Sequence, residues 1–131
     1  MKEVLDFLKE SRVFYVATIE GDQPRVRPFG AVCEFEGKIY LITANRKAVF
    51  AELTANPKLE ISCMTPDGRW LRLAAEAVRD DRFAAKKAML DANPDLRGMY
   101  HEDDGVMEVF YLTHAEASIC SFTEAPINYR F

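Results

Sequence analysis

The stretch Gln23–Lys47, QPRVRPFGAVCEFEGKIYLITANRK, decides the fold that we expect for this chain. It opens as a strand whose alternate side chains share one face, so Arg25, Arg27 and Phe29 should project together, with the arginines roughly 6–7 Å apart. Pro28 removes one ladder donor, which indicates an edge strand or a bulge at this point. After a Glu-Gly turn comes a second strand that is apolar on both faces, which suits a central position in a sheet.

The segment after this second strand predicts a helix that begins at Arg46. RKAVFAELTAN carries apolar residues at helical spacing and stops at Asn56-Pro57, and Asn45 is a suitable N-cap residue. Arg46 and Lys47 would then occupy the first turn, where the helix dipole disfavours each cation by ~0.3–1 kcal/mol. A bound anion would remove this conflict. We therefore expect these cations and the arginine strand to surround a phosphate-bearing ligand, the alternative being side chains that extend into water.

Composition places the chain among ordinary globular proteins. Its 131 residues suit a single domain, 1–131, and the hydrophobic content of 49% and charged content of 29% are unexceptional. A net charge of −4 offers no field that would attract nucleic acid or an anionic membrane. No apolar run approaches the ~18 residues of a membrane span, and Met-Lys-Glu starts no secretory signal, so we expect a cytoplasmic protein.

The remaining pattern predicts short strands punctuated by turns, with helices between them. We expect helices over Glu3–Glu10 and from Asp80 or Asp81 to Asp91, a helical turn from Asn93-Pro94, and strands over Val13–Glu20, Lys38–Ala44, Lys58–Met64, Arg69–Arg79 and Val106–Thr123. This order predicts an α+β protein in which an antiparallel barrel or sandwich is closed by helices.

Other kinds of site find little support in the sequence. Cys33, Cys63 and Cys120 are odd in number and lack C-x-x-C spacing, so we expect reduced, buried thiols and neither disulfides nor zinc. The acidic cluster His101–Gly105 has no further ligands at suitable spacing and predicts a solvated loop, so we expect no metal site. No nucleophile–base signature, G-x-G-x-x-G or Walker loop is present, which argues against a hydrolase.

Three segments in sequence carry a family resemblance: G-D-Q-P-R-V-R-P-F-G, then G-K-I-Y-L-I-T-A-N-R-K, then A-N-P-x-x-E-I-S. Their order and spacing resemble the pyridoxamine 5'-phosphate oxidase-like family, and in particular its small members related to nitroimidazole-resistance proteins. The resemblance covers nearly the whole chain. It implies an antiparallel split β-barrel with flanking helices, and a homodimer that binds FMN in the cleft between its subunits.

The resemblance also implies which positions hold the cofactor. By position, Val26, Arg27 and Pro28 correspond to the strand beside the flavin, and Ile42 and Thr43 to the end of the next strand. Arg46 and Lys47 correspond to the basic pair at the phosphate, and Trp70 and Arg72 lie on a later strand that approaches the ring. We add Arg25 from strand geometry and Asn45 from its expected capping role. Asn45 stands where many relatives have serine or threonine.

The expected function is that of an FMN-binding oxidoreductase, a flavin-dependent reductase of a small organic substrate. Members that oxidise pyridoxamine 5'-phosphate carry a C-terminal segment with an R-L-H-D-like motif, which this sequence does not contain, so we do not expect vitamin B6 oxidation. The sequence identifies neither the substrate nor the electron donor. The alternatives are a deazaflavin coenzyme or haem in the same fold, a non-enzymatic flavin-binding or stress-related module, and a barrel without a cofactor.

Overall fold

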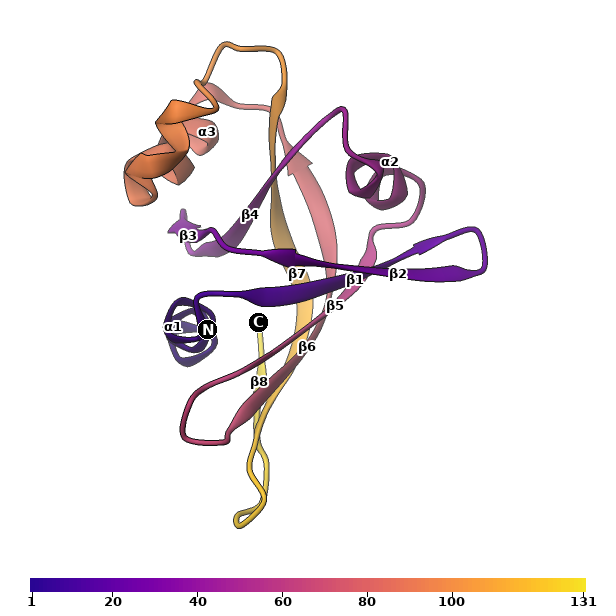
Figure 1. Ribbon diagram of the computed structural model, residues 1–131, viewed down its shortest axis with the longest axis vertical. Helices are drawn as coiled ribbons and strands as arrows, with labels where there is room; N and C mark the ends of the chain where they lie inside the picture. Colours follow the sequence, from indigo (N-terminus) through magenta and orange to yellow (C-terminus); the bar gives the residue numbers. More distant parts are fainter.

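Eight antiparallel strands form one strongly curved sheet in the computed structural model, which describes all 131 residues (Figure 1). The elements follow the order α1 (Lys2–Ser11), β1 (Phe14–Glu20), β2 (Gln23–Phe29), β3 (Val32–Phe35), β4 (Lys38–Ala44), α2 (Ala48–Ala55), β5 (Lys58–Met64), β6 (Trp70–Asp80), α3 (Phe83–Ala92), the 3₁₀ helix η1 (Pro94–Gly98), β7 (Met107–Cys120) and β8 (Ile127–Arg130).

The two ends of the sheet meet without pairing. The strand order is β2-β1-β5-β6-β7-β4-β3, with β8 paired to β7 outside this path. β2 and β3 are therefore at opposite ends of the path, although only Gly30-Ala31 joins them along the chain. The result is a barrel with an open seam beside this link, and the predicted α+β split-barrel fold is confirmed.

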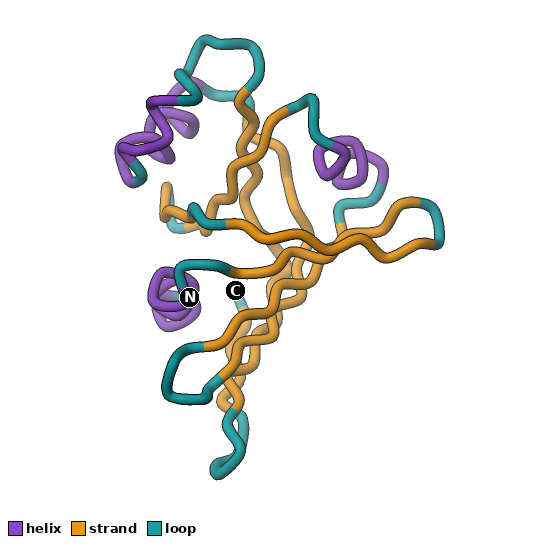
Figure 2. The backbone as a smooth tube through the Cα atoms, in the orientation of Figure 1, coloured by secondary structure: helices purple, strands orange, loops and turns teal.

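Helices cover the sheet on separate sides and bury two apolar clusters (Figure 2). α1 turns its buried residues toward the larger cluster, in which Phe14 and Leu73 are also completely buried. α3 packs against β3, β4 and β7 over a smaller cluster centred on Tyr40 and Met89. Burying a large apolar side chain contributes about 1.5–3 kcal/mol, so these clusters fix where the helices sit relative to the sheet.

The predicted start of the second helix is wrong. α2 begins at Ala48, its N-cap position is Lys47, and Arg46 lies in the preceding turn and not in the helix. Asn45 does not cap the helix, because its side-chain amide donates to the carbonyl of Gly105 at 2.9 Å and to the Glu108 carboxylate at 3.2 Å. Local apolar spacing suggested an earlier start, whereas hydrogen bonds to Gly105 before β7 and to Glu108 on β7, which lie 60 and 63 residues along the chain, keep this segment in a turn.

Two local predictions agree with the structure. The strand expected over Lys58–Met64 is present as β5, in which alternate residues are buried, and a 3₁₀ helix begins at Pro94. All three cysteines are free, but only Cys33 and Cys63 are buried, and Cys120 is partly exposed. No group of three or more His, Cys, Asp or Glu side chains is arranged to hold a metal ion. None of the helices is long and apolar enough to cross a membrane.

Candidate functional site

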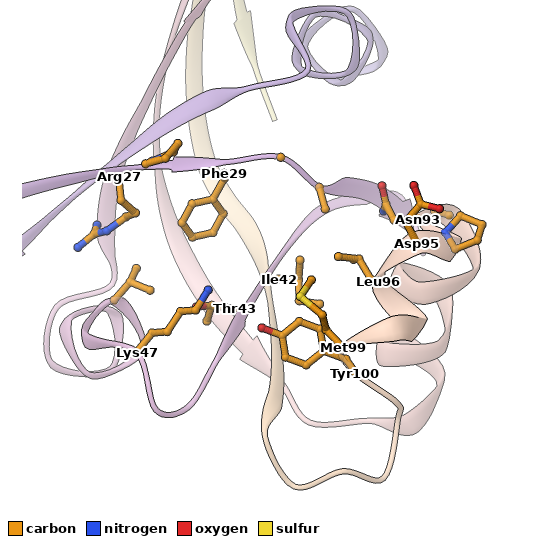
Figure 3. Close-up of a pocket in the computed structure, with 16 residues that line it drawn as sticks. Arg27, Phe29, Ile42, Thr43, Lys47, Asn93, Asp95, Leu96, Met99 and Tyr100 are labelled. Atoms are coloured by element: carbon orange, nitrogen blue, oxygen red, sulfur yellow. The ribbon is translucent and has the colours of Figure 1, made fainter.

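A pocket of about 570 Å³ opens beside the seam between β2 and β3 (Figure 3). Three parts of the chain form its walls: the end of β2 with the link to β3, the end of β4 with the start of α2, and the end of α3 with η1 and the residues that follow it. Its volume lies within the roughly 300–1,000 Å³ of typical small-molecule sites. Five of the sequence-predicted site residues line it: Arg27, Pro28, Ile42, Thr43 and Lys47.

One end of the pocket is suited to an anion. Lys47 lies at the N-cap position of α2, which has no side-chain cap, and Figure 3 shows its side chain extending into the pocket. The hydrogen bonds of the structure give no partner to the backbone N–H groups of Ala48 and Val49, the first two residues of the helix. Free N–H groups and a positive helix end, together with a lysine, are the elements from which proteins build phosphate sites.

A buried hydroxyl in the same wall lacks a partner. Thr43 is 4% exposed, lines the pocket, and is the one residue whose buried side-chain oxygen makes no hydrogen bond. Buried polar groups are almost always paired, because an unpaired one costs about 1–3 kcal/mol. This hydroxyl is therefore an unpaired polar group in the wall of the pocket.

Arg27 is held by the protein itself. One terminal nitrogen donates to the Val16 carbonyl at 3.2 Å and to the Thr18 hydroxyl at 2.7 Å, and the other donates to the Glu52 carboxylate at 2.6 Å. Glu52 is 6% exposed, and hydrogen bonds from Thr18 and then Arg27 lower its pKa below the ordinary value. Both members of the pair are thus charged at neutral pH, and their charges cancel.

A second ionic network fixes the turn that carries Lys47. Glu108, buried on β7, accepts two hydrogen bonds from Arg79, at 2.8 and 3.1 Å, and one from the Asn45 amide at 3.2 Å. The backbone N–H of Asn45 also donates to the carbonyl of Val106 at 2.9 Å. Asn45 therefore holds the turn against β7, whereas the sequence analysis expected it to cap the helix.

The other end of the pocket is mainly apolar. Ile42 and Phe29 form one side, and Leu96, Met99 and Tyr100 face them from η1 and the segment after it (Figure 3). Aliphatic, thioether and aromatic surfaces suit a flat ring system. Sequence analysis missed the η1 side of the wall. The only signal there was the helical turn expected from Asn93-Pro94, and its position against β4 depends on tertiary packing.

The remaining predicted residues lie outside the pocket of one chain. Arg25 forms an exposed ion pair with Glu20 at 2.8 Å, while Val26 is on the outer face of the sheet. Arg46 is exposed beside Lys47 without lining the pocket. At the far end of the sheet, the Trp70 ring contacts that of Phe122 with centroids 4.9 Å apart, and Arg72 approaches Glu60 at 3.7 Å. The structure thus separates Arg25, Trp70 and Arg72 from the cluster around Lys47.

Comparison with protein families settles the relationship of this chain. The family model for pyridoxamine 5'-phosphate oxidase matches residues 1–112. The chain belongs to the pyridoxamine 5'-phosphate oxidase-like family. Among solved structures of the family, a NimC/NimA family protein from Clostridium acetobutylicum is 50% identical, with a TM-score of 0.98 over 100% of this chain and 92% of that chain. This agrees with the predicted relation to nitroimidazole-resistance proteins.

More distant structures share the fold alone. A heme binding protein from Mycobacterium smegmatis is 16% identical, with a TM-score of 0.72 over 98% of this chain and 56% of that chain. A protein named F420 reductase is 17% identical, with a TM-score of 0.61 over 84% of this chain and 93% of that chain. Among curated proteins, none matches the sequence. The names of these two proteins point to different ligands, and neither assigns a ligand to this chain.

Proposed function

We propose that this chain binds FMN in the pocket beside the β2–β3 seam and acts as a homodimeric, FMN-dependent oxidoreductase on a small organic substrate. The observation that carries the proposal is the combination of Lys47 and the uncapped start of α2 with the unpaired hydroxyl of Thr43. These groups offer a phosphate site next to an apolar slot. The two ends of the pocket thus match the phosphate and the flat ring system of flavin mononucleotide. Membership of the family adds independent support.

The residues of this chain would bind and orient the cofactor. Lys47 and the N–H groups of Ala48 and Val49 would hold the phosphate, and the Thr43 hydroxyl would gain the partner that it lacks. Ile42 and Tyr100 would exclude water from the ring. When bound, the flavin supplies hydride or electron transfer, while the protein supplies position and electrostatics.

An exposed apolar surface supports the homodimer. On the outer face of the β1–β2 hairpin, Tyr15, Ile19 and Val26 are 50%, 39% and 67% exposed. In the register of this hairpin, Ala17 opposes Val26, and Tyr15 and Ile19 oppose prolines, so this face presents almost no charge. A contiguous apolar patch of this kind is typical of a protein–protein interface. In this proposal, a second copy bound in this region supplies its own Trp70 and Arg72 to the flavin.

Titration with FMN tests the proposal. The purified protein should bind FMN and turn yellow, and it should bind hemin or a deazaflavin coenzyme more weakly. Lys47→Ala should raise the Kd for FMN about 10- to 100-fold, because a hydrogen bond to a charged group contributes about 1.5–3 kcal/mol. Lys9→Ala, an exposed lysine on α1 that does not line the pocket, is the matched control and should leave the Kd unchanged. Tighter binding of hemin or deazaflavin, or equal affinity in the two variants, would refute the assignment.

Turnover separates an enzyme from a flavin-binding module. Bound FMN reduced chemically under anaerobic conditions should be reoxidised rapidly by small nitro-, quinone- or enone-type acceptors. A flavin that is reoxidised by none of these classes would contradict the oxidoreductase proposal while leaving FMN binding intact.

A further inference from the structure

Glu52 cancels the charge of the one arginine that lines the phosphate side of the pocket. Arg27 is 23% exposed at the pocket wall, and its guanidinium contacts the Glu52 carboxylate at 2.6 Å. Figure 3 shows Arg27 on the same side of the pocket as Lys47. Thr18, which is 2% exposed, donates to Glu52 and accepts from Arg27, so the three side chains form a closed network.

This network leaves Arg27 with donors but without net charge. A guanidinium has five N–H groups. Three of them are used by Val16, Thr18 and Glu52, which leaves the Nε–H and one terminal N–H without a partner in the chain. Nearby, Lys47 and Arg46 make no ion pair with any acidic side chain. Lys47 and the free N–H groups at the start of α2 therefore supply the positive site for a phosphate monoester, which carries about −1.5 to −2 charge at pH 7.

We infer that Glu52 is a specificity-determining residue of this site: it converts Arg27 from a phosphate-binding cation into a fixed donor for an uncharged part of the ligand. The inference rests on the proposed flavin site and goes beyond it, because the sequence analysis placed Arg27 in the arginine strand around a phosphate-bearing ligand and gave no role to Glu52. Phosphate recognition then belongs to Lys47 and the start of α2. Arg27 faces acceptors that carry no formal charge, such as a ring carbonyl or a sugar hydroxyl.

Riboflavin provides the direct test, because it is FMN without the phosphate. The ratio Kd(riboflavin)/Kd(FMN) measures how much the phosphate contributes to binding. Glu52→Gln keeps the shape of the network but exposes the charge of Arg27, so the ratio should rise about threefold to tenfold, as expected for one added charge near a solvated anion. Thr18→Val removes a hydrogen bond without changing charge and should leave the ratio as in the wild type.

The double variant Arg27→Gln/Glu52→Gln distinguishes this inference from direct phosphate binding by Arg27. If the pair contributes no net charge, the double variant binds both flavins more weakly but keeps the wild-type ratio. If Arg27 contacts the phosphate, the ratio falls in the double variant by about tenfold or more, the size of a lost charge-assisted hydrogen bond. A fallen ratio there, or an unchanged ratio in Glu52→Gln, would overturn the inference.

Inorganic phosphate gives a readout that needs no flavin. Protection of the apoprotein against thermal unfolding should increase in the order Lys47→Ala, wild type, Glu52→Gln, with the double variant equal to wild type. Thermal unfolding without phosphate establishes that each variant folds. If the wild type binds neither flavin, the proposed function fails. If it binds FMN but Glu52→Gln shifts neither the ratio nor the order of protection, this inference alone fails.

Discussion

Replacing Thr43 with valine should stabilise the free protein and weaken cofactor binding. Valine has nearly the same shape as threonine and is well accepted in a strand. The Thr43 hydroxyl is buried without a partner, so the folded state carries the cost of removing it from water. That cost is about 1–3 kcal/mol, and valine removes part of it because a methyl group replaces the unpaired hydroxyl. We expect a gain of about 1 kcal/mol, or roughly 3–5 °C in Tm for a chain of this size.

The ligand should reverse the sign of this effect. If FMN pairs with the hydroxyl, the substitution removes one hydrogen bond, which is worth about 1 kcal/mol for an uncharged partner and about 1.5–3 kcal/mol for a charged one. The Kd should therefore rise about fivefold to a hundredfold. The position of Thr43 beside Lys47 in the pocket wall favours the upper half of this range.

Urea denaturation of the apoproteins and fluorescence titration with FMN measure the two effects separately. Thr65→Val is the matched control, because Thr65 is also 4% exposed but its hydroxyl is paired with Asp67, outside the pocket. It should cost about 1 kcal/mol of stability and leave the FMN affinity unchanged. A Thr43→Val protein that is less stable than wild type, or that binds FMN equally well, would show that the unpaired hydroxyl does not serve the ligand.

Three further predictions concern other parts of the molecule. Arg82 holds the pKa of the buried Asp80 at about 2, below its ordinary 3.8, so the stability it contributes is present above pH 4 and is lost as the pH falls toward 2. Asp80→Asn should lower the free energy of unfolding by about 2 kcal/mol at neutral pH and make it depend less on pH between about pH 4 and 2. An unchanged pH dependence of unfolding in this range would contradict the prediction. Burial raises the pKa of Cys33 to about 11, so a thiol reagent at neutral pH should label Cys120 first; faster labelling of Cys33, detected by peptide mass mapping, would be inconsistent with this fold. Val26→Lys places a charge on the exposed β1–β2 face and should shift the protein from dimer to monomer in sedimentation, with weaker FMN binding; a stable dimer argues for another interface.

The fold could be predicted in detail because its elements depend on local patterns. Alternation defined β5, turn residues separated the strands, and Pro94 marked the start of η1. The start of α2 could not be predicted in this way. Asn45 carries a good capping side chain, but Gly105 and Glu108 use its amide, and only the folded sheet brings them within reach.

The candidate site was predicted in part for a similar reason. Strand spacing indicated Arg27 and the family resemblance indicated Thr43, and both line the pocket. Which arginine is available to a ligand depends on its acidic neighbours. Glu20 lies across a tight turn from Arg25, a pairing that the hairpin register makes accessible from sequence, whereas Glu52 reaches Arg27 from a helix. The wall formed by Met99 and Tyr100 follows from the packing of α3 against the sheet.

The turn at Asn45 is fastened to β7 through Glu108 and Arg79, and none of these three contacts involves a ligand. The proposed phosphate site would therefore be in place before a ligand binds, so little ordering entropy would oppose binding. Dissociation of the ligand and unfolding of the chain are then separate processes, and the ligand-free protein stays competent to bind again.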